Sequence, residues 1–218
     1  MAVRRKGADR AEVLVYRQGR RPVPFAVILI LVLAVLVVEL LAGMQIYLNQ
    51  TVLPLLATEM GARNAYGLVT AAAQVPAFLT MPLGGAMLAR WRPNRLMTAL
   101  TALLVFGAVV GALAPNVEVY VLGEILRGLA AGALATATMG VMVAGLPDAW
   151  RRLCLAGGSG MWVVAALAGP VYASGVSASW GWRWALVVYL PVLIAARAVM
   201  AGQIHDLRLD EETDHDET

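Results

Sequence analysis

The chain contains almost none of the side chains that bind metals or form disulfides. Its 218 residues include one cysteine, Cys154, and two histidines, His205 and His215. A single cysteine excludes an internal disulfide framework and a cysteine-ligated metal cluster. We therefore expect no metal and no cofactor.

Charged residues are also scarce. They make up 14% of the chain, against about 25% in an ordinary soluble domain, while hydrophobic residues make up 60%. A chain of this length cannot hide so much apolar surface from water, which indicates an integral membrane protein. The net charge of +3 is the sum of two oppositely charged zones, because residues 206–218 carry −6 and residues 1–205 carry +9.

Six apolar runs are long enough to cross a hydrocarbon core of about 30 Å, which takes about 20 helical residues. They show no alternation of polar and apolar residues, which favours helices over barrel strands. The sequence therefore predicts an all-α membrane protein with a single bundle of six transmembrane helices over residues 25–202. The predicted spans are 25–50, 66–89, 96–113, 119–146, 153–176 and 184–202.

Basic residues concentrate before the first span and in alternate loops. They include Arg90, Arg92 and Arg95 after the second span, and Arg151 with Arg152 after the fourth. Because positive residues stay on the cytoplasmic side, both termini are predicted to be cytoplasmic, as a basic segment 1–24 and an acidic tail 203–218. The first apolar run is too long for the core of a signal peptide, so we expect it to be retained. Anionic lipid is the expected partner of the basic loops, and no pattern indicates nucleic acid.

Polar side chains within the spans are candidate functional residues, because an ionisable group at bilayer depth costs about 2.5 to 3.5 kcal/mol on insertion scales. Glu39 lies about eleven residues before the outer end of the first span, near the midplane, and Gln45 about five residues before it. Glu39 has no evident partner, so it is either a proton carrier or a carboxylate that faces another helix or a water defect on the lipid side. Gln74 lies with Pro76 in the middle of the second span, where proline frees a backbone carbonyl.

Glu124 and Arg127 lie three residues apart in the fourth span, hence on one face of a helix. Two interpretations remain open. They form an intrahelical ion pair that lowers the cost of insertion, or they handle substrate or protons. Gln45 is expected at a depth similar to that of Glu124.

Two glycine pairs have the spacing that permits close contact between helices. Gly107 and Gly111 lie in the third span, and Gly128 and Gly132 in the fourth. We expect helix packing to be their role.

Five segments match, in order, the motifs of one transporter family. They read IYLNQTVLPLLATEMG (46–61), GAMLARWRPNR (85–95), EILRGLAAG (124–132), AALAGPVYASG (165–175) and WGWRWALVVYLP (180–191). Together they resemble the N-terminal six-helix half of a major facilitator superfamily transporter, in the style of the bacterial drug exporters. The resemblance covers about residues 25–202. It implies a gating loop that contains Gly85, Ala89, Arg90, Arg92 and Arg95, and an exporter motif at Gly169, Pro170, Ala173 and Ser174.

Several polar positions depart from the family's pattern. Ala89 replaces an aspartate and Arg92 a glycine in the gating loop, and Gln45 replaces the acid of the first span. In the fourth span Glu124 replaces an arginine and Arg127 a glutamine. The acid has thus moved from the first span to the fourth, which fits either a relocated coupling site or a chain that no longer transports.

The resemblance implies secondary transport in a bacterial cytoplasmic membrane, as proton-linked export of a small apolar or cationic compound. Glu39 or Glu124 would carry the proton. Members of the family usually place the substrate between two six-helix bundles, so we expect a second six-helix half, from a separate chain or a second copy. A non-transporting accessory or regulatory subunit, or a truncated transporter fragment, is the alternative.

An enzyme is not expected. Residues 157–160 fit the G-x-S-G motif of the rhomboid proteases, which place a nucleophilic serine inside the membrane. Such a serine needs a base within hydrogen-bond reach, and both histidines follow the last span. Packing is therefore the expected role of Ser159.

Overall fold

The computed structural model describes residues 25–61, 63–145 and 148–202. In this part of the chain every regular element is helical, and six helical segments are long and apolar enough to cross a membrane. This confirms the predicted all-α membrane fold. The elements are α2 (Phe25–Glu59), the 3₁₀ turn η1 (Arg63–Ala65), α3 (Tyr66–Arg90), α4 (Pro93–Ala112), α5 (Val117–Gly145), α6 (Asp148–Trp180) and α7 (Trp182–Ala185). A turn at 186–189 and a helical segment at 190–202 complete the sixth span.

The first helix is longer than the predicted span. α2 continues through Pro54 to Glu59, whereas the apolar run ends near Gln50. Gln45 therefore lies in the interior of α2, and the expectation that it lies about five residues from the end of its helix is wrong. Polar residues end the apolar run of the first span near Gln50. At membrane depth, however, backbone N–H and C=O groups still favour helical hydrogen bonds, whether the side chains are polar or apolar.

The regular helix of the sixth span has a short interruption. It begins as the single turn α7, passes through turns at 186–189, where backbone N–H groups still donate to carbonyls three or four residues back, and resumes as a regular helix at 190. The interruption is short and protein-covered, since Leu186, Tyr189 and Leu190 are all buried.

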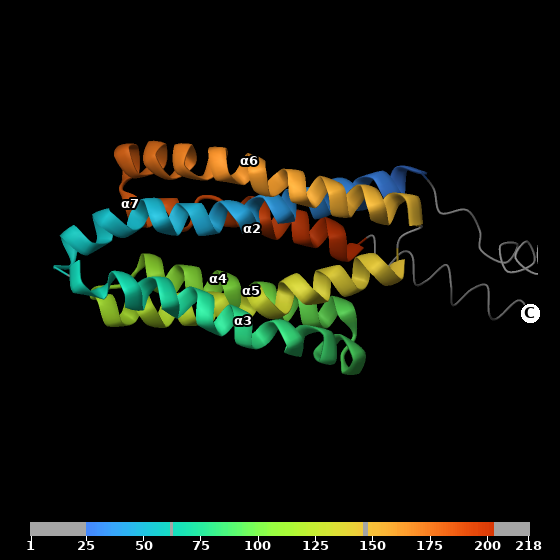
Figure 1. The fold of residues 1–218 in the computed structure, drawn as a ribbon, viewed down its shortest axis with the longest axis horizontal. Helices are drawn as coiled ribbons and strands as arrows, with labels where there is room; N and C mark the ends of the chain where they lie inside the picture. The colour runs from blue at the N-terminus through green and yellow to red at the C-terminus, as the bar shows by residue number, and fades with distance from the viewer. Residues whose placement is uncertain (1–24, 62, 146–147, 203–218) are drawn as a thin grey trace, which may run out of the picture.

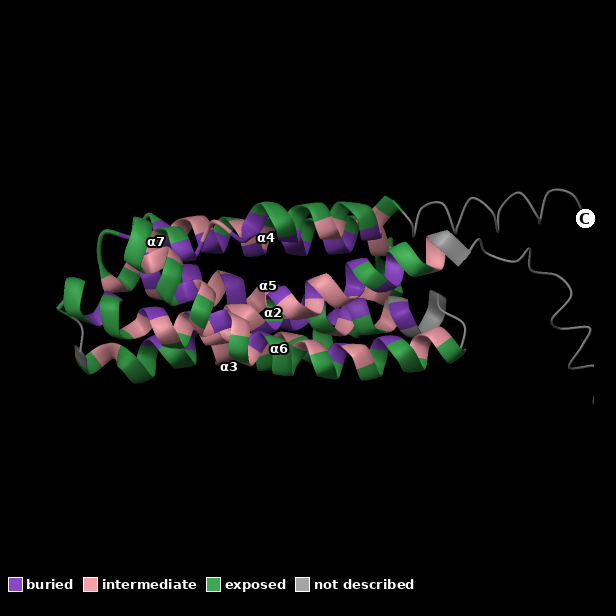
Figure 2. Ribbon diagram, turned by 90° about the horizontal axis from the view of Figure 1, so that it is seen from above, coloured by how far each residue is buried: buried purple, intermediate pink, exposed green. Residues whose placement is uncertain are grey.

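Helices that are distant in sequence pack as pairs. α2 packs along α6, and α5 packs along both α3 and α4, whereas α2 and α3 touch little. Figure 1 shows the result, with α6 and α2 on one side of the bundle and α3, α4 and α5 on the other. Turned by 90°, the same bundle has α3 and α6 along one edge and α4 along the opposite edge (Figure 2).

Glycine makes the contact between α3 and α5 close. A Cβ atom added at Gly128 or Gly132 would overlap the backbone carbonyl of Ala73 or Ala77 on α3. Thr80 of α3 also donates a hydrogen bond to the Leu129 carbonyl of α5 at 3.0 Å. On the other side of α5, a Cβ at Gly107 would lie 2.8 Å from the Gly123 carbonyl, while Gly111 has ordinary clearance. Of the four glycines in the two spaced pairs, three therefore lie where a side chain does not fit.

The start of α2 and the end of the segment 190–202 lie at the same end of the bundle, together with the loop between α3 and α4 (Figure 1). That loop contains Arg92, and α3 ends in Arg90. The fold thus gathers these arginines at one end of the bundle, and the cytoplasmic location of that end stays a prediction from the positive-inside rule.

The opposite end of the bundle is tied by the segment that follows α6. Arg183 donates to the carbonyls of Ala112 and Ala114 at 3.0 and 2.7 Å, and to the Glu59 carboxylate at 3.1 Å. The Trp182 indole also donates to Glu59, and the Arg183 guanidinium lies 4.6 Å from the centre of the Trp182 ring. This cluster joins the ends of α2 and α4 to the start of the sixth span.

Candidate functional site

A cavity of about 460 Å³ lies between α2, α3 and α5, where α2 and α3 diverge. α6 contributes Trp162 to its wall, and the segment 190–202 contributes Leu193 and Arg197. Most of the wall is apolar. Its polar and ionisable residues are Glu39, Gln45, Asn49, Gln50, Thr70, Gln74, Thr138, Trp162 and Arg197.

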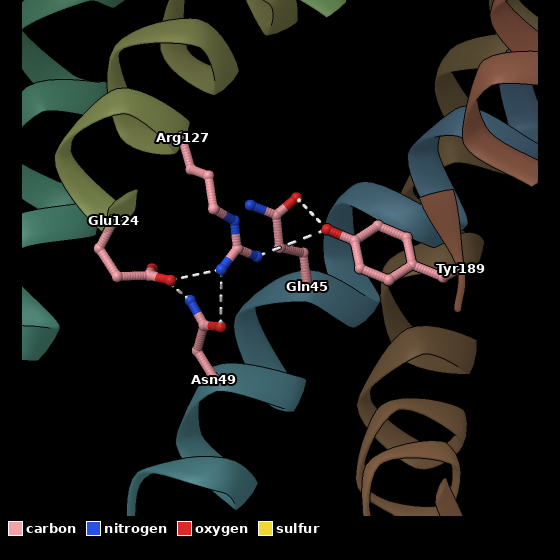
Figure 3. A network of polar contacts seen from close by, with 5 residues as sticks. All are labelled: Gln45, Asn49, Glu124, Arg127 and Tyr189. Atoms are coloured by element: carbon pink, nitrogen blue, oxygen red, sulfur yellow. Dashed lines mark hydrogen bonds and ion pairs between the residues drawn. The ribbon is translucent and has the colours of Figure 1, made fainter. Parts of the chain in front are cut away.

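At one side of the cavity, five residues form a polar cluster that we call the buried network: Gln45, Asn49, Glu124, Arg127 and Tyr189 (Figure 3). Its centre is an ion pair between Glu124 and Arg127, whose side chains are 1% and 0% exposed. Asn49 of α2 bridges the pair. Its amide nitrogen donates to Glu124 at 2.7 Å, and its amide oxygen accepts from Arg127 at 3.3 Å.

Arg127 also reaches the interruption in the sixth span. Its Nη2 donates to the Tyr189 hydroxyl at 3.4 Å. The Gln45 amide satisfies its neighbours when its oxygen faces Arg127, where it accepts from Nη2 at 3.0 Å and from Nε at 3.2 Å. The guanidinium is therefore surrounded by acceptors from α2, α5 and the turn 186–189.

The ion-pair interpretation of Glu124 and Arg127 describes the contact that the structure contains. Neither residue lies in the lining of the cavity as far as the chain is described. A buried charge that is matched by an opposite charge and by further hydrogen bonds is costly to disturb. The ion pair thus joins helices away from the described lining of the cavity, whereas Gln45 and Asn49 of the same network line it.

Asn49 and Tyr189 were not singled out in the sequence. Asn49 follows Gln45 by four residues, so the two share a helix face, and this spacing was a signal that could have been used. Tyr189 carried no such signal, because its role depends on the interruption of the sixth span.

Toward the other part of the cavity lie four residues that we call the cavity cluster: Glu39, Thr138, Trp162 and Arg197. All four line the cavity. The Glu39 carboxylate accepts a hydrogen bond from the Trp162 indole of α6 at 3.3 Å. Arg197 donates to the Thr138 hydroxyl at 3.0 Å and is close enough to Glu39 to interact with its charge.

Fewer of the polar groups in the cavity cluster have a hydrogen-bond or ion-pair partner than in the buried network. Neutral groups hold Glu39 and Arg197, and the Arg197 Nε is buried without an acceptor among the described residues. The sequence analysis identified Glu39 but overlooked Arg197. Its position five residues inside the predicted sixth span was a sufficient signal, since a cation within an apolar run is rare.

The structure does not bring the motif residues of the loops to the cavity. The residues at one end of α3 and α4 that form this motif are all exposed: Gly85, Ala89, Arg90, Arg92 and Arg95. Gly169 lies where α6 crosses α2, since a Cβ there would be 2.8 Å from the Tyr47 Cβ. Pro170 is inside α6, Ala173 is fully buried, and Ser174 donates to the Val171 carbonyl at 3.1 Å.

Gln74 lines the cavity from α3, opposite the polar residues of α2. Ser159 instead donates to the Leu155 carbonyl of its own helix at 3.1 Å and is exposed. His205 and His215 lie outside the described residues. The described geometry around Ser159 is a local helix contact.

The comparisons with known proteins agree on one family. The sequence profile of the Major Facilitator Superfamily matches residues 35–204. The fatty acid resistance protein FarB of Neisseria gonorrhoeae is 31% identical over 140 residues, which are 64% of this chain and 28% of FarB. A probable multidrug-efflux transporter of Mycobacterium tuberculosis is 31% identical over 164 residues, 71% of this chain and 32% of that protein. The MFS-type transporter TOXA of Cochliobolus carbonum is 26% identical over 129 residues, 59% of this chain and 24% of TOXA. The matches span only about a quarter to a third of the length of these relatives.

Proposed function

Because the chain belongs to the Major Facilitator Superfamily, we propose that it forms one six-helix half of a secondary transporter that exports small organic compounds. The observation that carries the proposal is the cavity of about 460 Å³ between α2, α3 and α5. Sites for small molecules range from about 300 to 1,000 Å³ and combine apolar walls with a few polar groups. The cavity has this size and this composition.

The apolar wall favours a hydrophobic compound. Val38, Leu53, Phe78 and Leu104 are among the residues that line it. The relatives named above are described as conferring fatty acid resistance or as a probable multidrug-efflux transporter, which supports export of hydrophobic compounds.

Transport requires a second six-helix bundle in this proposal. This bundle supplies only one wall of the cavity, and that wall contains Glu39, Gln74 and Arg197. Polar groups at membrane depth need protein or water around them, so a second wall is required. The second bundle can come from a longer form of the chain, from a separate chain, or from a second copy. In each case it would close the cavity from the side opposite the buried network.

Glu39 is the proposed proton carrier. It is the only carboxylate in the described lining of the cavity, and its hydrogen-bond donor is the neutral Trp162 indole. Glu124, the other candidate, is paired directly with Arg127 and is fully buried. A carboxylate that faces a cavity and is not held in a direct ion pair can exchange a proton with each side in turn.

The test measures proton-driven efflux of a lipophilic fluorescent dye from vesicles that contain the chain with its second bundle. We expect Glu39→Gln to abolish proton-driven efflux while the helix content is retained. Glu118→Gln is the matched control, because Glu118 is an exposed acid in the first turn of α5, away from the cavity. Unchanged efflux in Glu39→Gln would sink the coupling role, and no efflux by the wild type would sink the transport proposal.

One observation favours the accessory-subunit alternative. Ala89 is exposed at the end of α3, in the position where the family has an acid, and residues 85–95 contain no carboxylate. A loop that depends on an acid to close the cytoplasmic side would not work here. If the chain changes the efflux rate of a complete partner transporter but supports no efflux with a complementary half, this alternative is correct.

A further inference from the structure

A second concave surface lies on the other side of the bundle, between α4 and the segment 190–202. This α4 groove has a volume of about 320 Å³ and a nearly continuous apolar wall. Its lining residues are Met97, Thr98, Thr101, Ala102, Val105, Ile194, Arg197, Ala198, Met200 and Ala201.

Arg197 is the one charged residue in the lining of the α4 groove, and the one residue that lines both the groove and the central cavity. Its Nη1 donates to Thr138 on the cavity side. Its Nε is buried, and no acceptor reaches it from the described part of the chain. A buried guanidinium N–H without an acceptor is costly, so this atom is suited to an anionic oxygen from a ligand.

The charge lies near one end of the groove. Arg197 is five residues before Gly202, and Met97 is four residues after Pro93, so both are within about two helical turns of the predicted cytoplasmic side. From Met97 the wall continues to Val105, eight residues deeper, which is about 12 Å along the helix axis. The groove therefore presents a cation near the interface and an apolar channel toward the bilayer centre.

We propose that the α4 groove binds a single-chain amphiphile with a carboxylate head, and that Arg197 passes this head from the membrane to the cavity. The alkyl chain lies along α4, and the carboxylate accepts from the Arg197 Nε. A carboxylate fits better than a lipid phosphate, because a volume of about 320 Å³ suits one alkyl chain better than the two chains of a phospholipid. This inference rests on the proposed function, since it names a substrate class and a lateral route for it.

Binding is measured by equilibrium dialysis of radiolabelled dodecanoate against the full chain in a neutral detergent. Methyl dodecanoate has the same chain without the charge, and we expect it to bind about tenfold or more weakly. Arg197→Met should reduce dodecanoate binding to the level of the ester, and Arg197→Lys should restore part of it. Arg95→Met is the matched control, because Arg95 is exposed at the same end of α4 and does not line the groove.

A second variant tests the groove without touching the charge. Ala102 is exposed and lines the groove, so Ala102→Trp should fill it and weaken binding of both acid and ester. Helix content by circular dichroism checks that each variant is folded, and Ala102→Trp keeps the proposal testable if Arg197→Met is not. Added phosphatidylglycerol should not displace dodecanoate.

Three results would overturn the inference: equal binding of acid and ester, unchanged binding in a folded Arg197→Met, or displacement by phosphatidylglycerol at equal concentration. The last would identify an ordinary lipid site. The assay needs no transport, so its failure is distinguishable from failure of the proposed function. Efflux with no dodecanoate binding would refute only this inference, and binding with no efflux would refute only the transporter.

Discussion

The two charged clusters of the bundle stabilise their charges inside the protein in different ways. In the buried network a glutamate and an arginine contact each other directly, and three neutral side chains satisfy their remaining groups. In the cavity cluster Glu39 and Arg197 are each held by a neutral partner instead.

This difference separates charges that hold the bundle together from charges that are available to ligands. The side chains of Glu124 and Arg127 are almost fully inaccessible, and they tie α2, α5 and the turn 186–189 at one point. Glu39 and Arg197 line the cavity, and Arg197 keeps an N–H without an acceptor among the described residues. The two sites both contain charges. They differ in how many of their polar groups have a hydrogen-bond or ion-pair partner, and this distinguishes the structural site from the candidate functional one.

The largest expected effect comes from removing the cation of the buried network, and the matched change in the cavity cluster should cost much less. Arg127→Met should lower the free energy of unfolding by about 3 to 5 kcal/mol, because it leaves Glu124 buried without a positive partner. Arg197→Met should lower it by only about 1 kcal/mol, the value of one hydrogen bond. Reversible unfolding in mixed detergent micelles, followed by circular dichroism, measures both. Equal losses would show that the two clusters do not differ in kind.

A smaller effect is expected from the neutral bridging residues. Asn49→Leu should cost about 1 to 3 kcal/mol, because Glu124 loses a donor and Arg127 an acceptor in a buried place. Thr138→Val is the matched change in the cavity cluster and should cost about 1 kcal/mol or less. The same unfolding titration applies, and a greater loss in Thr138→Val would reverse the comparison.

The smallest effects are expected from the aromatic donors. Tyr189→Phe removes one hydroxyl that contacts Arg127 and should cost about 1 kcal/mol. Trp162→Phe removes a donor to Glu39 at a partly exposed site and should cost about 0.5 kcal/mol. Trp162→Phe should nevertheless alter proton-driven efflux, whereas Tyr189→Phe should not. Altered efflux in Tyr189→Phe alone would assign the coupling role to the buried network.

The sequence was enough to predict the six helices, because each span leaves a long apolar run with basic residues on alternate sides. It also identified the pair Glu124 and Arg127, since a helix places residues three apart on one face. It could not show that Asn49 and Tyr189 complete this pair, because they come from helices that meet α5 only in the folded bundle. The extension of α2 to Glu59 was missed because apolar length, and not backbone hydrogen bonding, set the predicted boundary.

Arg197 was missed for a different reason. Its position inside the predicted sixth span was visible in the sequence, but the contacts of its side chain were not. Its importance depends on Thr138 of α5 and on two concave surfaces that meet at its side chain. No local sequence pattern encodes such a meeting point.

The pairing of α2 with α6 has a consequence for how the protein is made. α3, α4 and α5 pack together within residues 66–145, but α2 ends at Glu59 and α6 begins only at Asp148. At a synthesis rate of about 5 to 20 residues per second, roughly 5 to 20 s pass before that partner begins to emerge from the ribosome. During this interval Glu39 has no Trp162 to donate to it, so the nascent first helix must be held by the insertion machinery or by lipid. A ribosome that stalls before residue 148 would release an unpaired α2 with an exposed acid, a form suited to recognition by membrane proteases.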